Sequence, residues 1–590
     1  MRPKRSGARH AAPILFALAC VAVAASQPAR AQQPTQLPPP AGSPIPRILP
    51  PAAPNVSRQA APAPAIPPNQ APDTPTRVTA VTIDGATAFP QAELLAAVGN
   101  IVGPATTYRQ IEAGRLALVR KYRGGGFPLV RVDTTVRDGQ AHYTISEGHI
   151  AEVKLEGDRD AIGPGAAQVL AFLNRLTEAT PLDAATLERY LLLAQDVPGM
   201  TIKAVLQPID GQPGAIRLIA QVSRAEFSGL ITADNRAFVN VGPLQVLGVL
   251  NLNSFTSFGE QTQLQLYGTP NFHGVFGGTE IFGQISTEFF LGASGLKLKI
   301  YAGAGDTTPG GDLALTNYEG RTIIFGTQAS YPVVRTRLET LNVLGIFDSL
   351  QSTVLTNTPQ TISSIDTFRV ARLGVDYAKR DTWLGDSFPA VNIASLRLSR
   401  GLDFLSPSAS NSSRVARRNT IINFTKFAGE LSREQTLFEP YEGATISLYG
   451  LVSGQYTGDV LPQAEKFNLG GLRITRGFFA GQVTGDTALA TTAELRLNTG
   501  FSTTLFGGST DIGMQFYGFY DWGQTWENGP SVDRTNHRLA SAGGGVRMTV
   551  SEYTEFDIEG VSRLTLHPQG GTQTNKVKAQ AIYMRALFKF

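Results

Sequence analysis

The sequence predicts a mainly β protein, in which a C-terminal transmembrane antiparallel β-barrel follows two small α+β domains. In residues 225–590, helical periodicity is absent and short alternating segments are separated by Gly, Asn, Asp, Ser and Thr. This pattern is typical of membrane barrels, and at ~10 residues per strand plus turns the region fits about 16 strands. Residues 77–224, in contrast, show one order of helical and strand periods twice. After residue 31, no apolar run reaches the roughly 18 residues of a membrane helix.

Residues 1–31 are expected to be a cleaved secretory signal peptide. A basic start is followed by the apolar run 11–25 and by Ala29-Arg30-Ala31, which fits an A-x-A cleavage site. Cys20, the only cysteine in the sequence, lies in the apolar run. It is expected to be an ordinary apolar residue of the signal, and a lipidated cysteine is the alternative. Cleavage would leave a mature chain without disulfides or cysteine metal ligands.

Residues 32–76 are predicted to be a disordered, proline-rich linker. The segment is nearly uncharged and has no apolar face, so it cannot bury enough surface to fold. Its proline content favours an extended, semi-rigid spacer.

Residues 77–149 are predicted to form the first small domain. Thr107 and Gln110 make a capping box that opens a helix, and Gly124-Gly125-Gly126 ends it. Asp138-Gly139 is the turn of a closing hairpin. The expected order is strand, helix, helix, strand, strand, over 78–83, 90–98, a helix after Thr107, 129–136 and 141–147.

Residues 150–224 are predicted to form a second domain of similar order. Asp183 is placed to cap a helix, which Pro198-Gly199 follows. The expected strands are 150–157, 201–207 and 215–222.

The last strand of the barrel region, 225–590, has the clearest alternation. Ile582, Met584, Ala586, Phe588 and Phe590 form a face suited to lipid, and Tyr583, Arg585, Leu587 and Lys589 form a face suited to a wet lumen.

Both small domains resemble POTRA domains, the periplasmic modules of outer-membrane transport and assembly proteins. In the first domain, the resemblance rests on Val81-Thr82-Ile83-Asp84-Gly85, Tyr122, Gly126-Phe127 and Ser146-Glu147-Gly148-His149-Ile150. In the second, it rests on Pro181-Leu182, Leu187-Glu188-Arg189 and Asp196-Val197-Pro198-Gly199, which are similar to the second POTRA domain of two-partner-secretion transporters.

Two barrel motifs extend the resemblance. Leu469-Gly470-Gly471-Leu472-Arg473-Ile474-Thr475-Arg476-Gly477-Phe478 resembles an inward-folded sixth extracellular loop, expected here near 462–485, with Thr475 where the family usually has Val or Ile. Phe519-Tyr520-Asp521-Trp522-Gly523 resembles the F-x-D-x-G motif of a barrel strand. From about residue 77 onward, the sequence therefore resembles the haemolysin secretion/activation transporters of two-partner secretion (TpsB, or FhaC/ShlB/HecB-like, proteins). The plug helix of that family is not evident in the proline-rich segment.

The resemblance implies a set of functional residues. Arg476 would pair with Asp521 and fix the loop to the inner wall, and Gly477, Phe478 and Gly523 would complete this loop–barrel lock. Phe519 and Trp522 are either part of the lock or plain wall aromatics. Phe588 and Phe590 would belong to a signal that the barrel assembly machinery recognises.

Other classes of function find little support. A formal net charge of +4 over 590 residues gives no case for nucleic-acid binding. There is no G-x-S-x-G nucleophile motif, and Gly385-Asp386-Ser387-Phe388 is a coincidental likeness in turn-like sequence. The six histidines lack metal-ligand spacing. Gly543-Gly544-Gly545 lacks the Lys-Ser/Thr of a P-loop and is expected in a curved barrel strand. We therefore expect no enzyme activity, no cofactor and no metal.

The leading hypothesis is a transporter in the Gram-negative outer membrane. Its periplasmic POTRA domains would recognise one large exoprotein, a haemolysin or adhesin, and its barrel would secrete that partner; outer-membrane lipid and the barrel assembly machinery are the other expected partners. One alternative is an insertase for other barrels, although insertases usually carry three or more POTRA domains and two are counted here. Another is a passive porin, which would not need periplasmic domains.

Overall fold

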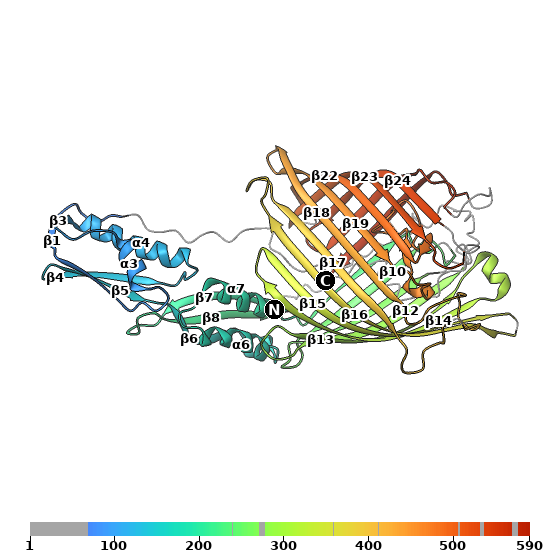
Figure 1. Cartoon of the computed structure of the whole chain (residues 1–590). Helices are drawn as coiled ribbons and strands as arrows, with labels where there is room; N and C mark the ends of the chain where they lie inside the picture. The colour runs from blue at the N-terminus through green and yellow to red at the C-terminus, as the bar shows by residue number, and fades with distance from the viewer. Residues whose placement is uncertain are drawn as a thin grey trace, which may run out of the picture.

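The computed structural model describes residues 69–590, with gaps at 239, 271–277, 358, 411, 506–507, 531–535 and 569–575. Two small domains precede a large barrel and lie at one of its ends (Figure 1). We call that end the domain-side mouth and the opposite end the far mouth. The expected signal peptide and residues 32–68 of the expected linker lie outside the described residues. Among the residues described, no helix is long and apolar enough to cross a membrane.

The first small domain follows the predicted order with two differences: the expected strand 78–83 is divided into β1 and β2, and β3 is added before the second helix. The capping box of Thr107 and Gln110 is confirmed, and the helix that it opens ends at Gly124. The added strand, β3, pairs with β1, which begins two residues before the expected domain start at 77. Its sequence has no apolar alternation from which a strand could be predicted. The elements are β1 (Pro75–Val78), β2 (Ala80–Asp84), α3 (Gln91–Val98), β3 (Gly103–Thr107), α4 (Tyr108–Gly124), β4 (Arg131–Arg137) and β5 (Gln140–Ser146).

The second small domain has a three-stranded sheet in the order β6-β8-β7. Asp183 caps helix α7 through the amide of Thr186, as the sequence predicts. A second long helix, α6, was not anticipated; its buried Phe172 and Leu173 join the core of this domain. The elements are β6 (His149–Glu156), α5 (Arg159–Ile162), α6 (Ala166–Asn174), η1 (Arg175–Glu178), α7 (Ala184–Gln195), β7 (Met200–Pro208) and β8 (Ala215–Arg224).

Sixteen antiparallel strands close the barrel, as the sequence predicts, with β26 pairing back to β9. The strands, in chain order, are β9 (Phe227–Asp234), β10 (Gln245–Asn253), β11 (Gln261–Thr269), β12 (Thr279–Phe290), β13 (Lys297–Thr308), β14 (Glu319–Arg335), β15 (Glu339–Thr356), β16 (Thr361–Asp381), β17 (Ala390–Leu402), β18 (Thr425–Tyr441), β19 (Ala444–Tyr456), β22 (Thr487–Leu505), β23 (Gly508–Trp526), β24 (Asn536–Val550), β25 (Thr554–Arg563) and β26 (Gln580–Lys589).

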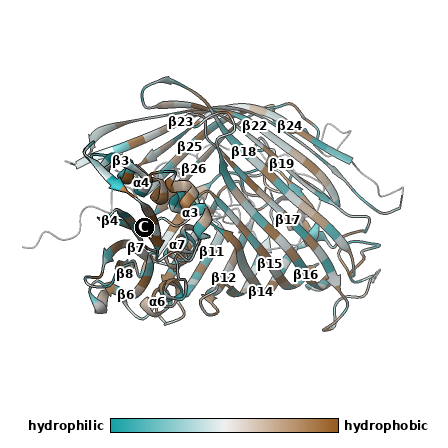
Figure 2. Ribbon diagram, turned by 60° about the vertical axis from the view of Figure 1, so that its left-hand side comes forward, coloured by the Kyte–Doolittle hydropathy of each residue, from teal (hydrophilic) through white to brown (hydrophobic). Residues whose placement is uncertain are grey.

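Hydrophobic and hydrophilic residues interleave along the barrel strands (Figure 2). In β26, Ile582 is 60% exposed while its neighbour Tyr583 is buried, as the predicted alternation requires at these two positions. Ala586, predicted to lie on the lipid face, is buried. The same two-residue period puts Asp521 inside and Tyr520 outside on β23.

The second small domain is fixed to three hairpin turns at the domain-side mouth. Ser254, in the β10–β11 turn, donates a hydrogen bond to the carbonyl of Pro198 at 2.7 Å. In the β12–β13 turn, the carbonyl of Gly292 accepts one from Gln168 at 2.9 Å. At the β14–β15 turn, Arg335 makes a two-point contact with Asp196, at 2.8 Å for each nitrogen–oxygen pair. Phe172 also packs edge-on against Phe290 of β12, with ring centroids 5.0 Å apart.

Glu147, at the junction of the two small domains, closes the core of the first. Its carboxylate accepts hydrogen bonds from the amides of Thr87 and Ala88, each at 2.8 Å, and from the Tyr122 hydroxyl at 2.6 Å. Burial raises the pKa of Glu147, but these hydrogen bonds outweigh burial and hold the pKa below its ordinary value. The charged carboxylate therefore stabilises the folded domain.

We expect Glu147→Gln to destabilise the first small domain by about 1–3 kcal/mol, because the amide loses charge-assisted hydrogen bonds. The pKa of Glu147 is lower in the folded domain than in the unfolded chain. Its contribution to the free energy of unfolding is therefore fully present above the unfolded pKa and is lost as pH falls through the folded pKa. Hydrogen exchange of residues 80–146 in the full-length protein measures both effects. Glu112→Gln, which removes a carboxylate paired within one helix turn to Arg115, is the control. Equal exchange in wild type and Glu147→Gln would contradict the assignment.

Candidate functional site: a loop held inside the barrel

The connection from β19 to β22, residues 457–486, folds into the barrel. It contains a short 3-10 turn, η3 (Gln463–Glu465), and a small hairpin of β20 (Phe467–Leu469) and β21 (Val483–Gly485). Both hairpin strands lie against β23. We call residues 457–486 the inner loop and residues 470–482 its tip.

Four residues of the tip have positive φ, and three of them, Gly470, Gly471 and Thr475, lie in its first half. Gly470 and Gly471 have φ of 99° and 105°, which glycine adopts without strain. Thr475 has φ of 51°, an unusual value for a β-branched residue. Its hydroxyl accepts a hydrogen bond from the Gly470 amide and donates one to the Ile474 carbonyl, each at 2.7 Å. Valine or isoleucine could make neither bond, so threonine stabilises this turn locally.

Arg476 and Asp521 are in direct contact. The backbone amide of Arg476 donates to Asp521 Oδ2 at 2.8 Å, and its Nε and Nη2 reach the two carboxylate oxygens at 3.1 Å each. The Arg476 side chain is 6% exposed and that of Asp521 is fully buried. This planar two-point geometry is specific to a guanidinium facing a carboxylate.

A second set of charges surrounds this pair. Arg476 Nη1 donates to Glu494 of β22 at 2.5 Å and lies 3.7 Å from Glu559 of β25. Four guanidinium groups and four carboxylates alternate through the buried cluster, and a fifth carboxylate, Glu434, pairs with Arg496 at its edge. The four guanidinium groups and four carboxylates of the cluster belong to Arg236, Arg476, Arg496, Arg547, Glu494, Asp521, Asp557 and Glu559.

Two aromatic rings of β23 contact the faces of two of these guanidinium groups. Arg476 lies over Phe519 at 3.9 Å from the ring centroid, and Arg547 lies over Tyr517 at 3.8 Å. The rings lie flat because glycine leaves room beside them: a Cβ on Gly543 would come within 2.9 Å of Phe519, and one on Gly545 within 2.7 Å of Tyr517. Phe519 therefore belongs to the cluster.

The remaining motif residues provide close packing. A Cβ on Gly477 would meet Ser541 of β24 at 2.5 Å, so glycine is needed for the close approach of the tip to the wall. Gly523 lies under the tip, where a Cβ would meet Leu469 at 2.9 Å. Phe478 is fully buried with Val483 and other apolar residues.

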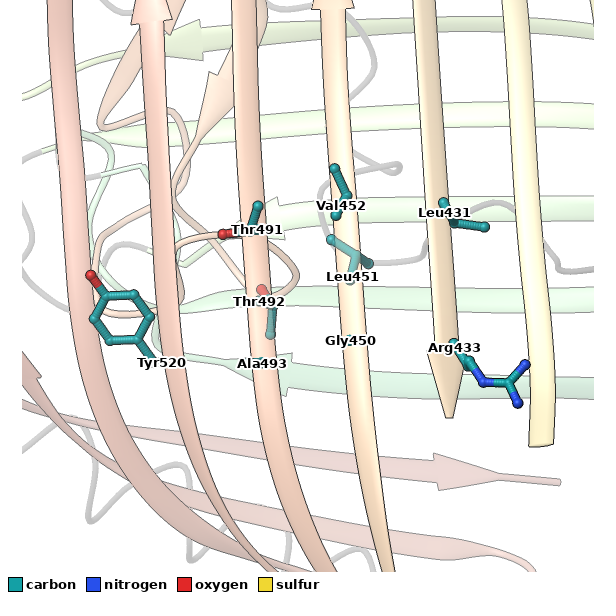
Figure 3. Close-up of a pocket in the computed structure, with 9 residues that line it drawn as sticks. All are labelled: Leu431, Arg433, Gly450, Leu451, Val452, Thr491, Thr492, Ala493 and Tyr520. Carbon is teal, nitrogen blue, oxygen red and sulfur yellow. The ribbon is translucent and has the colours of Figure 1, made fainter. Parts of the chain in front are cut away.

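The other face of the same wall carries a shallow groove, lined by residues of β18, β19, β22 and β23 (Figure 3). Leu431, Val452 and Tyr520 are 57%, 46% and 45% exposed. Tyr520 lies between two inward residues of its strand, so the exposed part of the groove faces away from the lumen. Trp522 shares that outward face, and its ring centroid lies 5.8 Å from the guanidinium carbon of Arg538. Trp522 is therefore not part of the loop contacts.

Several contact residues were not predicted from the sequence. Glu494, Arg547 and Glu559 lie in ordinary alternating strands, and Arg236 lies in the β9–β10 connection. In such segments a charged residue indicates only a wet lumen. The signal is collective, because Glu494, Arg547 and Glu559 point into the lumen from strands near β23, which carries Asp521. Among the residues that the structure describes, no group of three His, Cys, Asp or Glu side chains could hold a metal ion.

We expect Gly477→Ala to displace the tip from the wall, because the added methyl would lie 2.5 Å from Ser541. The barrel should still form, with faster limited proteolysis of the inner loop in detergent. Gly458→Ala is the matched control, since a Cβ at that position of the same loop meets nothing within 4 Å. Wild-type proteolysis rates in Gly477→Ala would refute the close approach.

Comparisons with known proteins agree with this architecture. The family model "Haemolysin secretion/activation protein ShlB/FhaC/HecB" matches residues 286–548. The heme/hemopexin transporter protein HuxB of Haemophilus influenzae (strain 86-028NP) is 21% identical over 480 residues, 77% of each chain. CdiB from Escherichia coli shares the fold with a TM-score of 0.69 at 16% identity, covering 90% of this chain and 94% of that one. CdiB from Acinetobacter baumannii has a TM-score of 0.60 at 15% identity, covering 91% and 95%. Residues 286–548 thus match the model of the haemolysin secretion/activation family, and the chain as a whole is similar to two-partner-secretion transporters.

Proposed function

We propose that this protein recognises one large exoprotein, of haemolysin or adhesin type, through its POTRA domains and exports it through its barrel. The protein is an outer-membrane barrel with its POTRA domains in the periplasm, so the domain-side mouth is the periplasmic one. The observation that supports the proposal is the inner loop, a separate segment that lies in the lumen and contacts the wall through side chains and a few backbone groups. Such a segment can leave without breaking the hydrogen-bonded wall.

The contact between Arg476 and Asp521 has the strength expected of a gate that opens and closes. A hydrogen bond to a charged group contributes about 1.5–3 kcal/mol, which is enough to shift a loop between two positions and small against the stability of a closed barrel. Removing the Arg476 guanidinium would take a positive charge from between Asp521, Glu494 and Glu559 and leave the cluster with excess negative charge. That imbalance is tolerable only if water enters the site. Loss of the pair is therefore expected to favour a hydrated lumen with the tip released.

Arg476→Ala is expected to leave the barrel folded and to reduce export of the partner protein at least about tenfold, the factor that corresponds to ~1.4 kcal/mol. Lysine at position 476 should restore little of the export, because it lacks the planar guanidinium that contacts both Asp521 oxygens. Export is measured as secreted exoprotein relative to the cell-associated pool. Arg397→Ala removes a wall arginine whose partner, Asp376, lies on the neighbouring strand at 2.7 Å, and should export normally. Undiminished export by Arg476→Ala would exclude the proposed role.

Phe590 completes the seam between the last and first strands. Its amide and carbonyl pair with Gly229 of β9 at 3.1 and 2.9 Å. Its ring stacks on Phe588 with centroids 6.4 Å apart. We propose that these two aromatics form the barrel assembly signal.

Phe590→Asp should lower the amount of folded, heat-modifiable barrel in the outer membrane, because the charge removes the aromatic signal and weakens the seam. Tyr553→Asp, a change at another exposed aromatic on the same side of the barrel, serves as the control. Normal levels of folded Phe590→Asp would contradict the assignment.

A further inference from the structure

Besides the Arg476 contacts, the inner loop has several other ion pairs, which join Arg473 to Glu430, Lys466 to Glu527 and Asp486 to Arg417. A further charged contact, before the tip, involves two wall cations at once. Glu465, the last residue of η3, accepts hydrogen bonds from Arg372 of β16, at 3.0 Å from Nη1 and 2.6 Å from Nη2. It also accepts from Lys426 of β18 at 2.6 Å. The side chains of Glu465, Arg372 and Lys426 are only 6%, 18% and 9% exposed.

The backbone of the loop is held at the same place. The carbonyl of Glu465 accepts a hydrogen bond from Lys426 Nζ at 2.9 Å and another from Gln455 at 3.1 Å. Asp348 of β15 accepts from Arg372 Nε at 2.8 Å, so the cluster contains two cations and two carboxylates. Three of these four charges belong to the wall, and only Glu465 belongs to the loop.

The two contacts lie on different parts of the wall. Glu465 binds β16 and β18, whereas Arg476 binds β22 and β23. Along the closed ring, β16 and β23 are five strands apart in a barrel of sixteen. Glu465 and Arg476 are separated by 11 residues, a length of chain that spans at most about 40 Å when extended. Releasing the tip alone leaves the loop tethered inside the barrel.

We propose that Glu465 is a second anchor of the inner loop, and that breaking the Arg476 contact alone does not release the loop from the lumen. The proposal rests on the export function proposed above, because it assigns a gating role to the loop. Glu465 acts by positioning the loop, and its carboxylate neutralises Lys426 directly. When the loop leaves, Arg372 and Lys426 face the lumen with Asp348 as their single counter-charge.

The test measures single-channel conductance of purified full-length protein in planar bilayers. Glu465→Lys places a third cation beside Arg372 and Lys426, so the fraction of time in the large open state should rise at least about tenfold. Glu465→Gln, which keeps the shape of the side chain, should show a smaller rise in the same direction. The double exchange Glu465→Lys/Lys426→Glu restores an opposite-charge pair and should return the open fraction to within about threefold of wild type. Heat-modifiability confirms that each variant is folded.

Asp376→Lys is the matched control. Asp376 lies on β16 four residues from Arg372, on the same face, and pairs with Arg397 of the wall. In that pairing Asp376 touches no loop residue. The open fraction of Asp376→Lys should therefore remain near that of wild type. An unchanged open fraction in both Glu465 variants, an equal rise in Asp376→Lys, or failure of the double exchange to restore closure would overturn the proposal. No exoprotein is present, so failure of the export function would appear in the Arg476→Ala secretion assay and not here.

Discussion

The interior of this barrel is organised around one requirement: a buried guanidinium must be paired. Arg476 is almost fully removed from solvent, where an unpaired charge would be far too costly to hold. Asp521 and Glu494 supply the direct counter-charges, and the surrounding arginines balance the remaining carboxylates. The tight turn at Thr475 and the glycine at 477 bring the tip close enough to the wall for this pairing. The glycines of β24 make room for the supporting rings.

The same requirement explains why the site is divided between loop and wall. Arg476 of the loop is compensated by wall carboxylates, and Asp521 of the wall is compensated by Arg476. Folding of the loop and charge balance in the lumen are therefore linked. Removing one partner of a buried pair is much more costly than replacing both. A loop held in this way is well defined in position, yet it is held by contacts that water can replace. This combination distinguishes it from a hydrophobic plug.

Much of the architecture could be predicted because local signals carried it. The length of the alternating region gave about sixteen strands, and Thr107 with Asp183 marked two helix starts. Strand β3 and helix α6 could not be predicted in this way, because β3 lacks alternation and α6 lacks a side-chain cap. The proximity of Arg476 and Asp521 could be anticipated only from the two motifs. The cluster around them depends on register between distant strands, as between Glu494 and Phe519, which no single strand encodes.

Under the proposed export function, the docking of the second small domain on three barrel turns has a kinetic consequence. A segment of an exported chain captured by that domain would be held within a few nanometres of the entrance instead of diffusing through the periplasm. Entry then becomes an intramolecular step, with an effective concentration that for short tethers reaches the millimolar range. Weak, short-lived capture is sufficient under those conditions. Tight binding would instead slow the forward movement of the chain, so the fixed position of the domain favours modest affinity.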